Sequence, residues 1–255
     1  MMKKLFLVVI FIGSVALSAT AQQRSNWLSI SIGAAVPFND FSNKTLTDTI
    51  LRSGFAQTGF AFNLAYTYQM VHSFGITAMF MGNGNSSDIS AMEQEMQRYI
   101  KGTSEIGDFS NSGTIGKWNT GMLLVGPNLN FGQRDFFVEI RGLLGVGMGF
   151  SPKYDYKIIP AEGALAGKTI DFIQQPDKAV AFAWNVGAGV KYCFSRYFVR
   201  LNVDYSATNL EYKNVNIQFH NPNDNETGKD YINRNSKMSI QTDVMQITGG
   251  IGYLF

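Results

Sequence analysis

The side chains that could carry out acid–base or nucleophilic chemistry are few and scattered in this sequence. It contains two histidines, His72 and His220, and a single cysteine, Cys193. Nucleophilic hydrolysis needs a histidine held beside the nucleophile, but His72 falls in a predicted tight turn and His220 in a predicted long loop. We therefore expect no catalytic residue and predict that the protein is not an enzyme.

Two motifs resemble ligand-binding loops without matching them. Asn221–Asp230 has oxygen donors at alternate positions, as a calcium loop does, but lacks the glycine at its sixth position and the glutamate at its twelfth. The segment GVGMG, Gly145–Gly149, has neither the spacing nor the following helix of a dinucleotide-binding fingerprint. Histidine, cysteine and acidic residues also lack the spacing of a zinc site. We expect no metal and no cofactor.

Charged residues on predicted strands form the most distinctive group. Glu139 and Arg141 lie two residues apart and therefore share a strand face, as do Arg200 and Asp204, and Lys191 lies on the small-residue face of another strand. Enclosed charges must be paired because their desolvation is costly. We predict an interior cluster that acts as a salt-bridged plug. A narrow pore lined by the same groups is the alternative that the sequence leaves open.

The segments that carry these charges alternate large apolar side chains with small or polar ones. In QTGFAFNLAYTYQM, every second residue from Phe60 to Met70 is large and apolar, and the residues between them are small or polar. This period of two predicts β-strands with one apolar face. The eight predicted strands carry the segments WLSISIGAAV, QTGFAFNLAYTYQM, FGITAMF, WNTGMLLVGPNLNF, FFVEIRGLLGVGMGF, FAWNVGAGVKYCF, YFVRLNVDY and the terminal MQITGGIGYLF. In the fourth strand, Pro127 predicts a local irregularity.

The connections between these strands alternate strictly between short and long. Tight turns are expected at 71–73, 132–135 and 195–196. The long connections cover residues 38–56, 83–117, 151–179 and 208–237. Four long loops would therefore lie at one end of the structure, with three turns and both termini at the other end. In the fourth loop, the segment YKNVNIQF can extend its strands as a hairpin.

The composition of the two strand faces decides which one lies outside. An eight-stranded sheet should close, because open edges invite aggregation. Glycine, alanine and serine cover an exterior poorly but fit the inside of a narrow barrel, and the aromatic face suits lipid. We predict an all-β fold, an eight-stranded antiparallel transmembrane β-barrel with long extracellular loops and short periplasmic turns. A soluble lipocalin-like barrel is the alternative.

The first residues have the features of an export signal. A basic start at Lys3 and Lys4 precedes an apolar run and the small residues Ala19-Thr20-Ala21. We predict a signal peptide over residues 1–21 and a barrel domain over residues 22–255. The full chain carries 21 basic and 19 acidic residues, so the remainder has 19 of each. This balance gives no indication of nucleic acid as a partner.

With its export signal, amphipathic strands and terminal YLF, the chain resembles small bacterial outer-membrane β-barrels. The segment LLVGPNLNF before a tight turn is similar to outer-membrane barrel domains of Bacteroidota, a group that includes PorT-like proteins. The resemblance covers Gln22–Phe255. It implies that the barrel assembly machinery reads the last strand, with Tyr253 and Phe255 as the assembly signal. It also implies location in the bacterial outer membrane, periplasmic termini and turns, and loops at the cell surface.

The second long loop contains the one clear helical pattern. Around residues 88–101, Met92 and Met96 fall on one helical face, and Ser90 with Glu93 offers a capping box. We predict a short amphipathic helix that packs over the barrel mouth; contact with a partner or with headgroups is the alternative.

The predicted function is non-enzymatic: the surface loops mediate contact or envelope-related interactions. The expected partners are outer-membrane lipid, the barrel assembly machinery and a surface or secretion partner protein, with the chain itself a monomer. Two alternatives remain open at this point. One is a narrow pore for ions or small solutes, and the other is a PorT-like accessory role in protein secretion.

Overall fold

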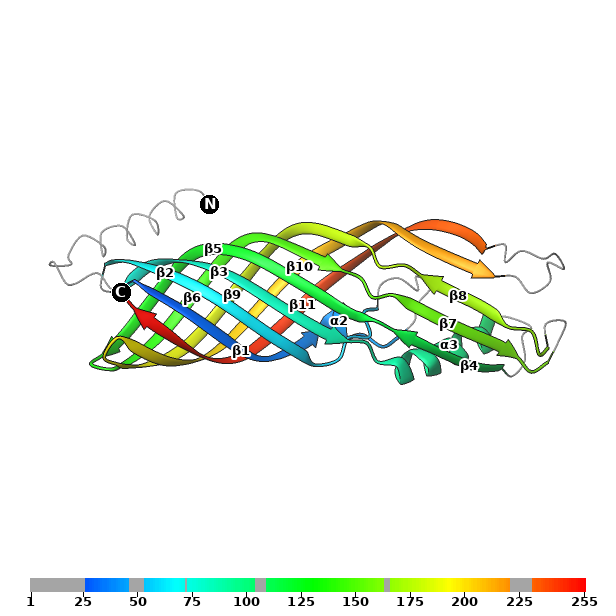
Figure 1. Cartoon of the computed structure of the whole chain (residues 1–255), viewed down its shortest axis with the longest axis horizontal. Coiled ribbons are helices and arrows are strands. Elements are labelled where there is room, and N and C mark those ends of the chain that lie inside the picture. Colours follow the sequence, from blue (N-terminus) through cyan, green and yellow to red (C-terminus); the bar gives the residue numbers. More distant parts are fainter. Residues whose placement is uncertain (1–25, 46–52, 72, 104–108, 163–165, 221–230) are drawn as a thin grey trace, which may run out of the picture.

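The computed structural model describes residues 26–45, 53–71, 73–103, 109–162, 166–220 and 231–255. The predicted signal peptide at residues 1–21, His72 and the calcium-like segment Asn221–Asp230 lie outside these residues. The described chain forms an elongated body, with the C-terminus and the short turns at one end (Figure 1).

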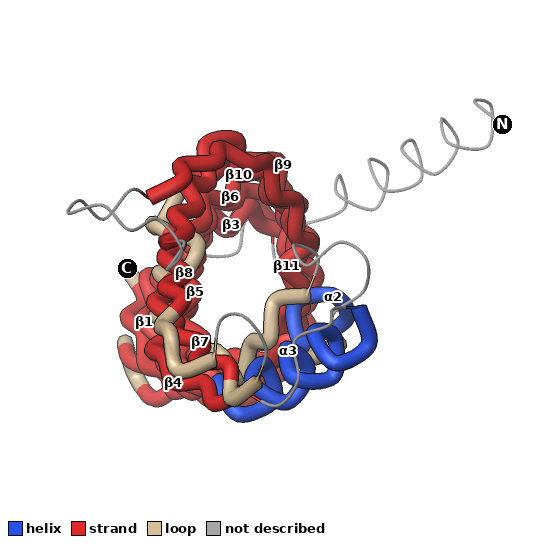
Figure 2. Tube along the Cα trace, turned by 90° about the vertical axis from the view of Figure 1, so that its right-hand side faces the viewer, coloured by secondary structure: helices blue, strands red, loops and turns tan. Residues whose placement is uncertain are grey.

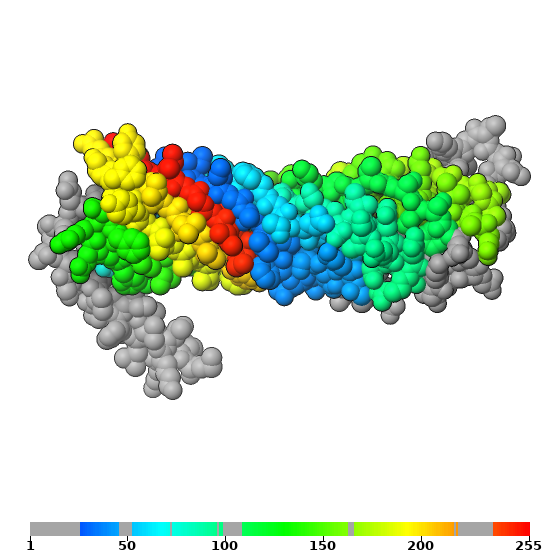
Figure 3. All heavy atoms as spheres, turned by 90° about the horizontal axis from the view of Figure 1, so that it is seen from below, coloured from blue at the N-terminus to red at the C-terminus, as the bar shows by residue number. Residues whose placement is uncertain are grey.

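Eight long strands form a closed antiparallel ring, which confirms the predicted fold. The ring follows the order β11-β1-β2-β3-β5-β6-β9-β10, and β10 pairs with β11 to close it. These strands are β1 (Trp27–Phe38), β2 (Gly59–Val71), β3 (Phe74–Ser86), β5 (Lys117–Gln133), β6 (Phe136–Phe150), β9 (Lys178–Phe194), β10 (Tyr197–His220) and β11 (Tyr231–Leu254). The first strand, in blue, and the last, in red, lie side by side on the surface in Figure 3.

The turns at one end are as short as the sequence predicts. β5 and β6 are joined by Arg134 and Asp135 alone, and β9 and β10 by Ser195 and Arg196. Arg134 and Ser195 have φ of 59° and 60°, the left-handed conformation that tight hairpin turns require. The pairing of β5 with β6 is interrupted at Gly126 and Pro127, the irregularity that the proline predicts.

The two faces of the wall are those that the alternation predicts. Leu123, Phe182 and Ile251 are more than three-fifths exposed on the outside. The inner face needs small residues because its larger neighbours fill the space. A Cβ added at Gly187 would come within 2.0 Å of Asp204 Oδ1, and one at Gly252 within 2.1 Å of the Phe198 ring. The apolar side chains therefore face outward, as on a barrel surrounded by lipid.

Three of the four long connections contain regular strands that the sequence does not predict in full. Three further strands, β4 (Phe109–Ile115), β7 (Tyr154–Pro160) and β8 (Ile170–Gln174), continue the pairing of β5, β6 and β9 beyond short breaks. β10 and β11 also run on as a paired hairpin to His220 and Tyr231, which confirms the hairpin and places His220 at the end of a strand. We call β4, β7, β8 and residues 209–220 and 231–242 the strand extension. It lies at the end opposite the C-terminus (Figure 1).

Two helices lie beside the strand extension. Figure 2 shows α2 (Asn39–Ser42) and α3 (Ile89–Thr103) at one side of the ring, near β4. Helix α3 confirms the predicted helix, but the predicted capping box is wrong. Asp88 Oδ1 accepts the Ala91 N–H at 3.1 Å, because the helix begins at Ile89 and Asp88 takes the capping position. Among the described residues, no helix is long and apolar enough to cross a membrane.

Candidate functional site: a filled lumen below a strand extension

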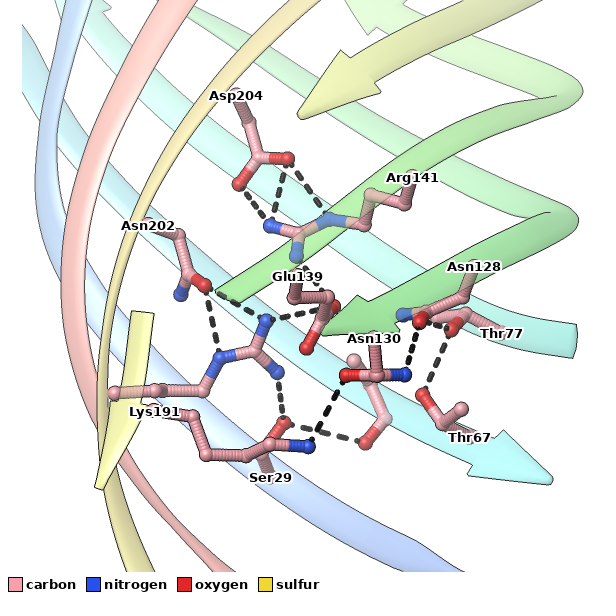
Figure 4. A network of polar contacts seen from close by, with 12 residues as sticks. Ser29, Thr67, Thr77, Asn128, Asn130, Glu139, Arg141, Lys191, Asn202 and Asp204 are labelled. Carbon is pink, nitrogen blue, oxygen red and sulfur yellow. Dashed lines mark hydrogen bonds and ion pairs between the residues drawn. The ribbon is translucent and has the colours of Figure 1, made fainter. Parts of the chain in front are cut away.

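The predicted charged residues come together inside the barrel, and Arg141 is at their centre. Arg141 Nε and Nη2 donate to Asp204 Oδ1 at 3.0 and 2.8 Å, and Nη2 also donates to Oδ2 at 2.6 Å. Its third nitrogen, Nη1, donates to Glu139 Oε1 at 2.6 Å (Figure 4). All three side chains are at least 98% buried. The forked geometry of the guanidinium therefore joins two carboxylates from two strands.

Glu139 links this pair to a second arginine. Arg200 Nη2 lies 3.3 Å from Glu139 Oε1, so the carboxylate is shared between two guanidinium groups. Arg200 also donates to Asn202 Oδ1 and, at 2.7 Å, to Ser29 Oγ on β1. The network thus connects β6 to β10 and β1 across the lumen. Residues two apart on one strand reach each other because they share the inner face.

Lys191 is the member of the cluster that is held differently. Its Nζ lies 3.5 Å from the centre of the Trp27 ring and 3.3 Å from Asn130 Oδ1. A cation above an indole face is stabilised by the ring's quadrupole. Three cations therefore share the lumen with two carboxylates, Glu139 and Asp204. Sequence reasoning identified Lys191 but missed the aromatic contact, because Trp27 is 164 positions away in the chain.

Neutral polar side chains extend the network towards β2 and β3. Asn130 Nδ2 donates to Asn128 Oδ1 at 2.5 Å, and Asn128 Nδ2 donates to Thr77 Oγ1 at 3.1 Å. The hydroxyls of Thr77 and Thr67 lie 2.7 Å apart. These four residues fill the part of the lumen opposite Asp204 (Figure 4). The spacing of two between Asn128 and Asn130 on β5 was the available sequence signal, whereas Thr67 and Thr77 come from two other strands.

Above the polar network, an apolar cluster fills the end of the barrel that carries the strand extension. The Trp118 ring lies 5.7 Å from Phe41 and 6.2 Å from Tyr212, between centroids. Trp118 Nε1 donates to Gly54 O at 2.8 Å, which ties the returning β1–β2 connection to β5. Leu210 of β10 and Ile240 of β11 pack in the same cluster. We call these residues the mouth cluster.

The segment that follows Gly54 enters a second apolar cluster. Phe55 is 98% buried, contacts Met92 and Tyr154, and has φ of 48°. A bulky residue at positive φ is strained and persists only where the surroundings hold it. Here its N–H donates to Asn43 O at 3.1 Å and its carbonyl accepts the Asp88 N–H at 2.7 Å. Helix α3 therefore packs through Met92 against Phe55 and against Tyr154 of the strand extension, at one side of the ring (Figure 2).

Several ionisable groups of this region have shifted pKa values, and Asp88 and Tyr154 are two of them. The hydrogen bond from Lys44 Nζ to Asp88 Oδ2, 2.6 Å long, lowers the pKa of Asp88, and the Ala91 N–H lowers it further. Burial raises the pKa of Tyr154 well above its usual range. Tyr154 is therefore a neutral packing residue at any physiological pH. Neither shift places a general acid or base near neutrality.

The family assignment follows from a comparison of the sequence with family models. The model described as outer membrane protein beta-barrel domain matches residues 9–255. The chain belongs to this family. The match agrees with the closed ring, the outward apolar face and the terminal strand pairing. The match does not distinguish PorT-like proteins of Bacteroidota from other members of the family, so that narrower resemblance stays a prediction. A comparison with curated proteins finds no match.

Solved structures similar to this barrel include several outer-membrane proteins. The attachment invasion locus protein Ail of Yersinia pestis has 14% identity and a TM-score of 0.43, over 92% of this chain and 100% of Ail. OprG of Pseudomonas aeruginosa has 12% identity and a TM-score of 0.42, over 91% and 97%. The outer membrane protease OmpT of Escherichia coli has 12% identity and a TM-score of 0.39, over 94% and 100%.

The residues of the predicted assembly signal lie where the barrel closes. Tyr253 packs edge to face against Tyr197 at 5.4 Å and against Phe255 at 5.2 Å. The Phe255 N–H donates to Asn26 O at 2.8 Å, and its side chain is 67% exposed. The last residue is thus fastened by its backbone while its ring faces outward. Its reading by the assembly machinery stays a prediction.

Proposed function

We propose that this protein is a non-conducting outer-membrane barrel that holds the strand extension and helix α3 outside the cell as a surface for contact with another molecule. The observation that carries the proposal is the combination of a filled lumen with an ordered extension. An open channel has no need for a packed projecting sheet, whereas a contact surface has to be held in a fixed shape.

The filling of the lumen opposes the alternative of a narrow pore. Eight strands enclose a space that side chains can fill completely. Here the Arg141 network occupies the middle and the mouth cluster occupies one end. A solute would have to displace both. Breaking the Arg141–Asp204 pair would leave buried charges without partners, which is costly.

The proposed orientation places the strand extension outside the cell and the short turns in the periplasm. The long connections of bacterial barrels face outward and their short turns face the periplasm, and the aromatic strand ends at Tyr197, Tyr253 and Phe255 suit a membrane interface. We further propose that residues 1–21 are a signal peptide, which would export the chain to this membrane.

Labelling of intact cells tests this orientation. The substitution Gln94→Cys places a thiol on the exposed face of α3, in a Cys193→Ser background that removes the natural cysteine. We expect a membrane-impermeant maleimide to label this variant on intact cells. The matched control is Arg134→Cys, in an exposed turn at the opposite end, which should label only after the cells are lysed. Labelling of Arg134→Cys but not of Gln94→Cys on intact cells would contradict the proposal.

A further inference from the structure

The wall of the barrel opens between β9 and β10 at the base of the strand extension. β9 pairs with β10 from Phe194 up to Ala183, opposite Thr208, and the pairing of β10 resumes with β8 only at Ile217. Over the same stretch, β9 remains paired with β6, and β10 remains paired with β11 except at a bulge at Lys213 and Asn214. The two strands thus separate from each other while each keeps its other neighbour in the ring.

Hydrogen bonds close this opening at both ends. At its lower end, Thr208 Oγ1 donates to Phe182 O at 3.0 Å. At its upper end, the Asn214 N–H donates to Asp177 Oδ2 at 3.0 Å, and the Gln175 N–H donates to Asn216 O at 3.1 Å. The separation is therefore a bounded window in the wall and not a frayed strand end.

The window forms the floor of a groove of about 300 Å³ on the outside of the wall. Ala181 lies on the inward-facing column of β9, between two buried alanines, yet it is partly exposed and lines this groove. Phe182 and Trp184 form one side, and Asn209 and Gln241 form the other. An inward residue can be reached from outside only because the strands have separated.

Two side-chain amides line the groove, and in each of them one polar atom already makes a hydrogen bond within the protein. Gln241 Nε2 donates to both oxygens of Asp243, at 3.1 and 2.9 Å, which holds the amide in place. Asn209 Oδ1 accepts the Ser239 hydroxyl at 3.1 Å. The other polar atom of each amide can bind a ligand: Gln241 Oε1 is an acceptor and Asn209 Nδ2 is a donor. The carbonyl of Phe182 faces β10, so the backbone N–H and C=O of Val180, two residues further along, face the window as well.

The groove lies at the boundary of the apolar band. Trp184 packs against Tyr205 with ring centroids 5.5 Å apart. Towards the short turns, the outward-facing residues of β9 and β10 are apolar and exposed, as at Val186 and Val203. Towards the strand extension, the same two strands carry the exposed Lys178 and Lys213. Aromatic girdles mark the depth of lipid headgroups. A ligand of this groove would therefore be held at headgroup depth.

We propose that this groove binds a sugar ring from the headgroup of a glycolipid. The assignment of this lipid to the outer leaflet rests on the orientation proposed above. The side chains that line the groove carry no formal charge, so they offer a phosphate or an ammonium group no ion pair. A pyranose ring combines apolar C–H faces, which suit Phe182 and Trp184, with hydroxyls that donate and accept. Amides and unpaired strand backbone match those hydroxyls.

Lipid retention by the purified full-length barrel tests this proposal independently of orientation in the cell. The protein is placed in nanodiscs with equal amounts of monoglucosyl diacylglycerol and phosphatidylcholine that carry the same acyl chains, and retained lipid is measured by native mass spectrometry. We expect one glucolipid to be retained in preference to phosphatidylcholine. Asn209→Leu should reduce this preference about fivefold, the effect of one lost hydrogen bond, and Trp184→Leu should reduce it too.

The matched control is Asn119→Leu, the same substitution at an exposed strand residue of β5 outside the groove. It should leave the preference unchanged. Heat-modifiable migration of each variant shows that the barrel has folded. The proposal is overturned if the wild type retains both lipids equally, or if Asn119→Leu lowers the preference as much as Asn209→Leu does. Equal retention would leave the labelling result on intact cells untouched, so the two proposals fail separately.

Discussion

At the scale of single residues, the charged side chains in the lumen stabilise the barrel only when each has a partner of opposite charge. Arg141 joins Asp204 and Glu139, and all three side chains are buried. Removing one partner of such a pair leaves an uncompensated charge in a medium of low dielectric constant. Replacing both partners with apolar residues of similar volume removes that penalty. The network should therefore respond very differently to single and double substitutions.

Arg141→Met is expected to destabilise the barrel by about 3–5 kcal/mol, because Asp204 would stay buried without its partner. The double variant Arg141→Met/Asp204→Leu should recover about half of that loss or more, because Glu139 keeps Arg200 as its partner. Urea unfolding in lipid vesicles measures both values. Arg134→Gln, on an exposed turn, should stay within about 0.5 kcal/mol of the wild type. A double variant as unstable as the single one would show that these charges do not act as a pair.

At the scale of elements, the helix α3 depends on its first turn. Asp88 caps the helix through the Ala91 N–H and accepts a hydrogen bond from Lys44. Loss of a capping side chain costs about 1 kcal/mol. Asp88→Ala should therefore raise the rate of proteolytic cleavage within α3 several-fold, with the ring left intact. Cleavage within α3 at the wild-type rate would contradict this role of Asp88.

The same carboxylate predicts a dependence on pH. Lys44 lowers the pKa of Asp88 in the folded protein, so its stabilising effect is present above the unfolded pKa of about 4. That effect is lost as the pH falls through the lower folded value. Hydrogen exchange of α3 amides, corrected for the intrinsic rate, should therefore become faster in acid. Asp88→Asn should remove this dependence; if the variant keeps it, another group is responsible.

The elements also show what the sequence could and could not predict. The eight ring strands were predictable because Phe60 and its neighbours alternate with small residues, and a barrel in lipid makes that contrast large. β7 was not, because its inward Tyr154 and Tyr156 resemble the aromatic residues that elsewhere face outward. Its partners β4 and β8 are only seven and five residues long, so their pairing is decided by the strands that they continue. The cap at Asp88 was missed because Ser90 offered a better local pattern.

The candidate sites divide in the same way. Spacing of two on one strand brought Glu139 to Arg141, and the exclusion of charge from lipid placed Lys191 in the lumen. The mouth cluster was not predictable, since Phe41, Trp118 and Tyr212 come from three distant segments that meet only when the ring closes. The window between β9 and β10 depends on where pairing stops. No local sequence pattern in β9 or β10 predicts the residue at which their pairing ends.

At the scale of the whole molecule, the described chain is a closed ring whose lumen is filled and whose wall continues as a sheet. The polar network and the mouth cluster lie one behind the other along the barrel, so a permeating ion would meet both. Each cluster is built from several strands, and β10 contributes Asp204 to the charged cluster and Tyr212 to the mouth cluster. Blockage of the lumen therefore depends on the complete barrel, and it supports the proposal of a contact protein over that of a pore.

Conductance across a planar bilayer tests this account most directly. Purified barrel is inserted into the bilayer, and heat-modifiable migration of the same preparation shows that it is folded. The account predicts no stepwise conductance above the bare bilayer, because the Arg141 network and the mouth cluster block the lumen. Steady, reproducible conductance steps from the wild-type barrel that change size in Arg141→Met would contradict it, and would establish the lumen as a pore.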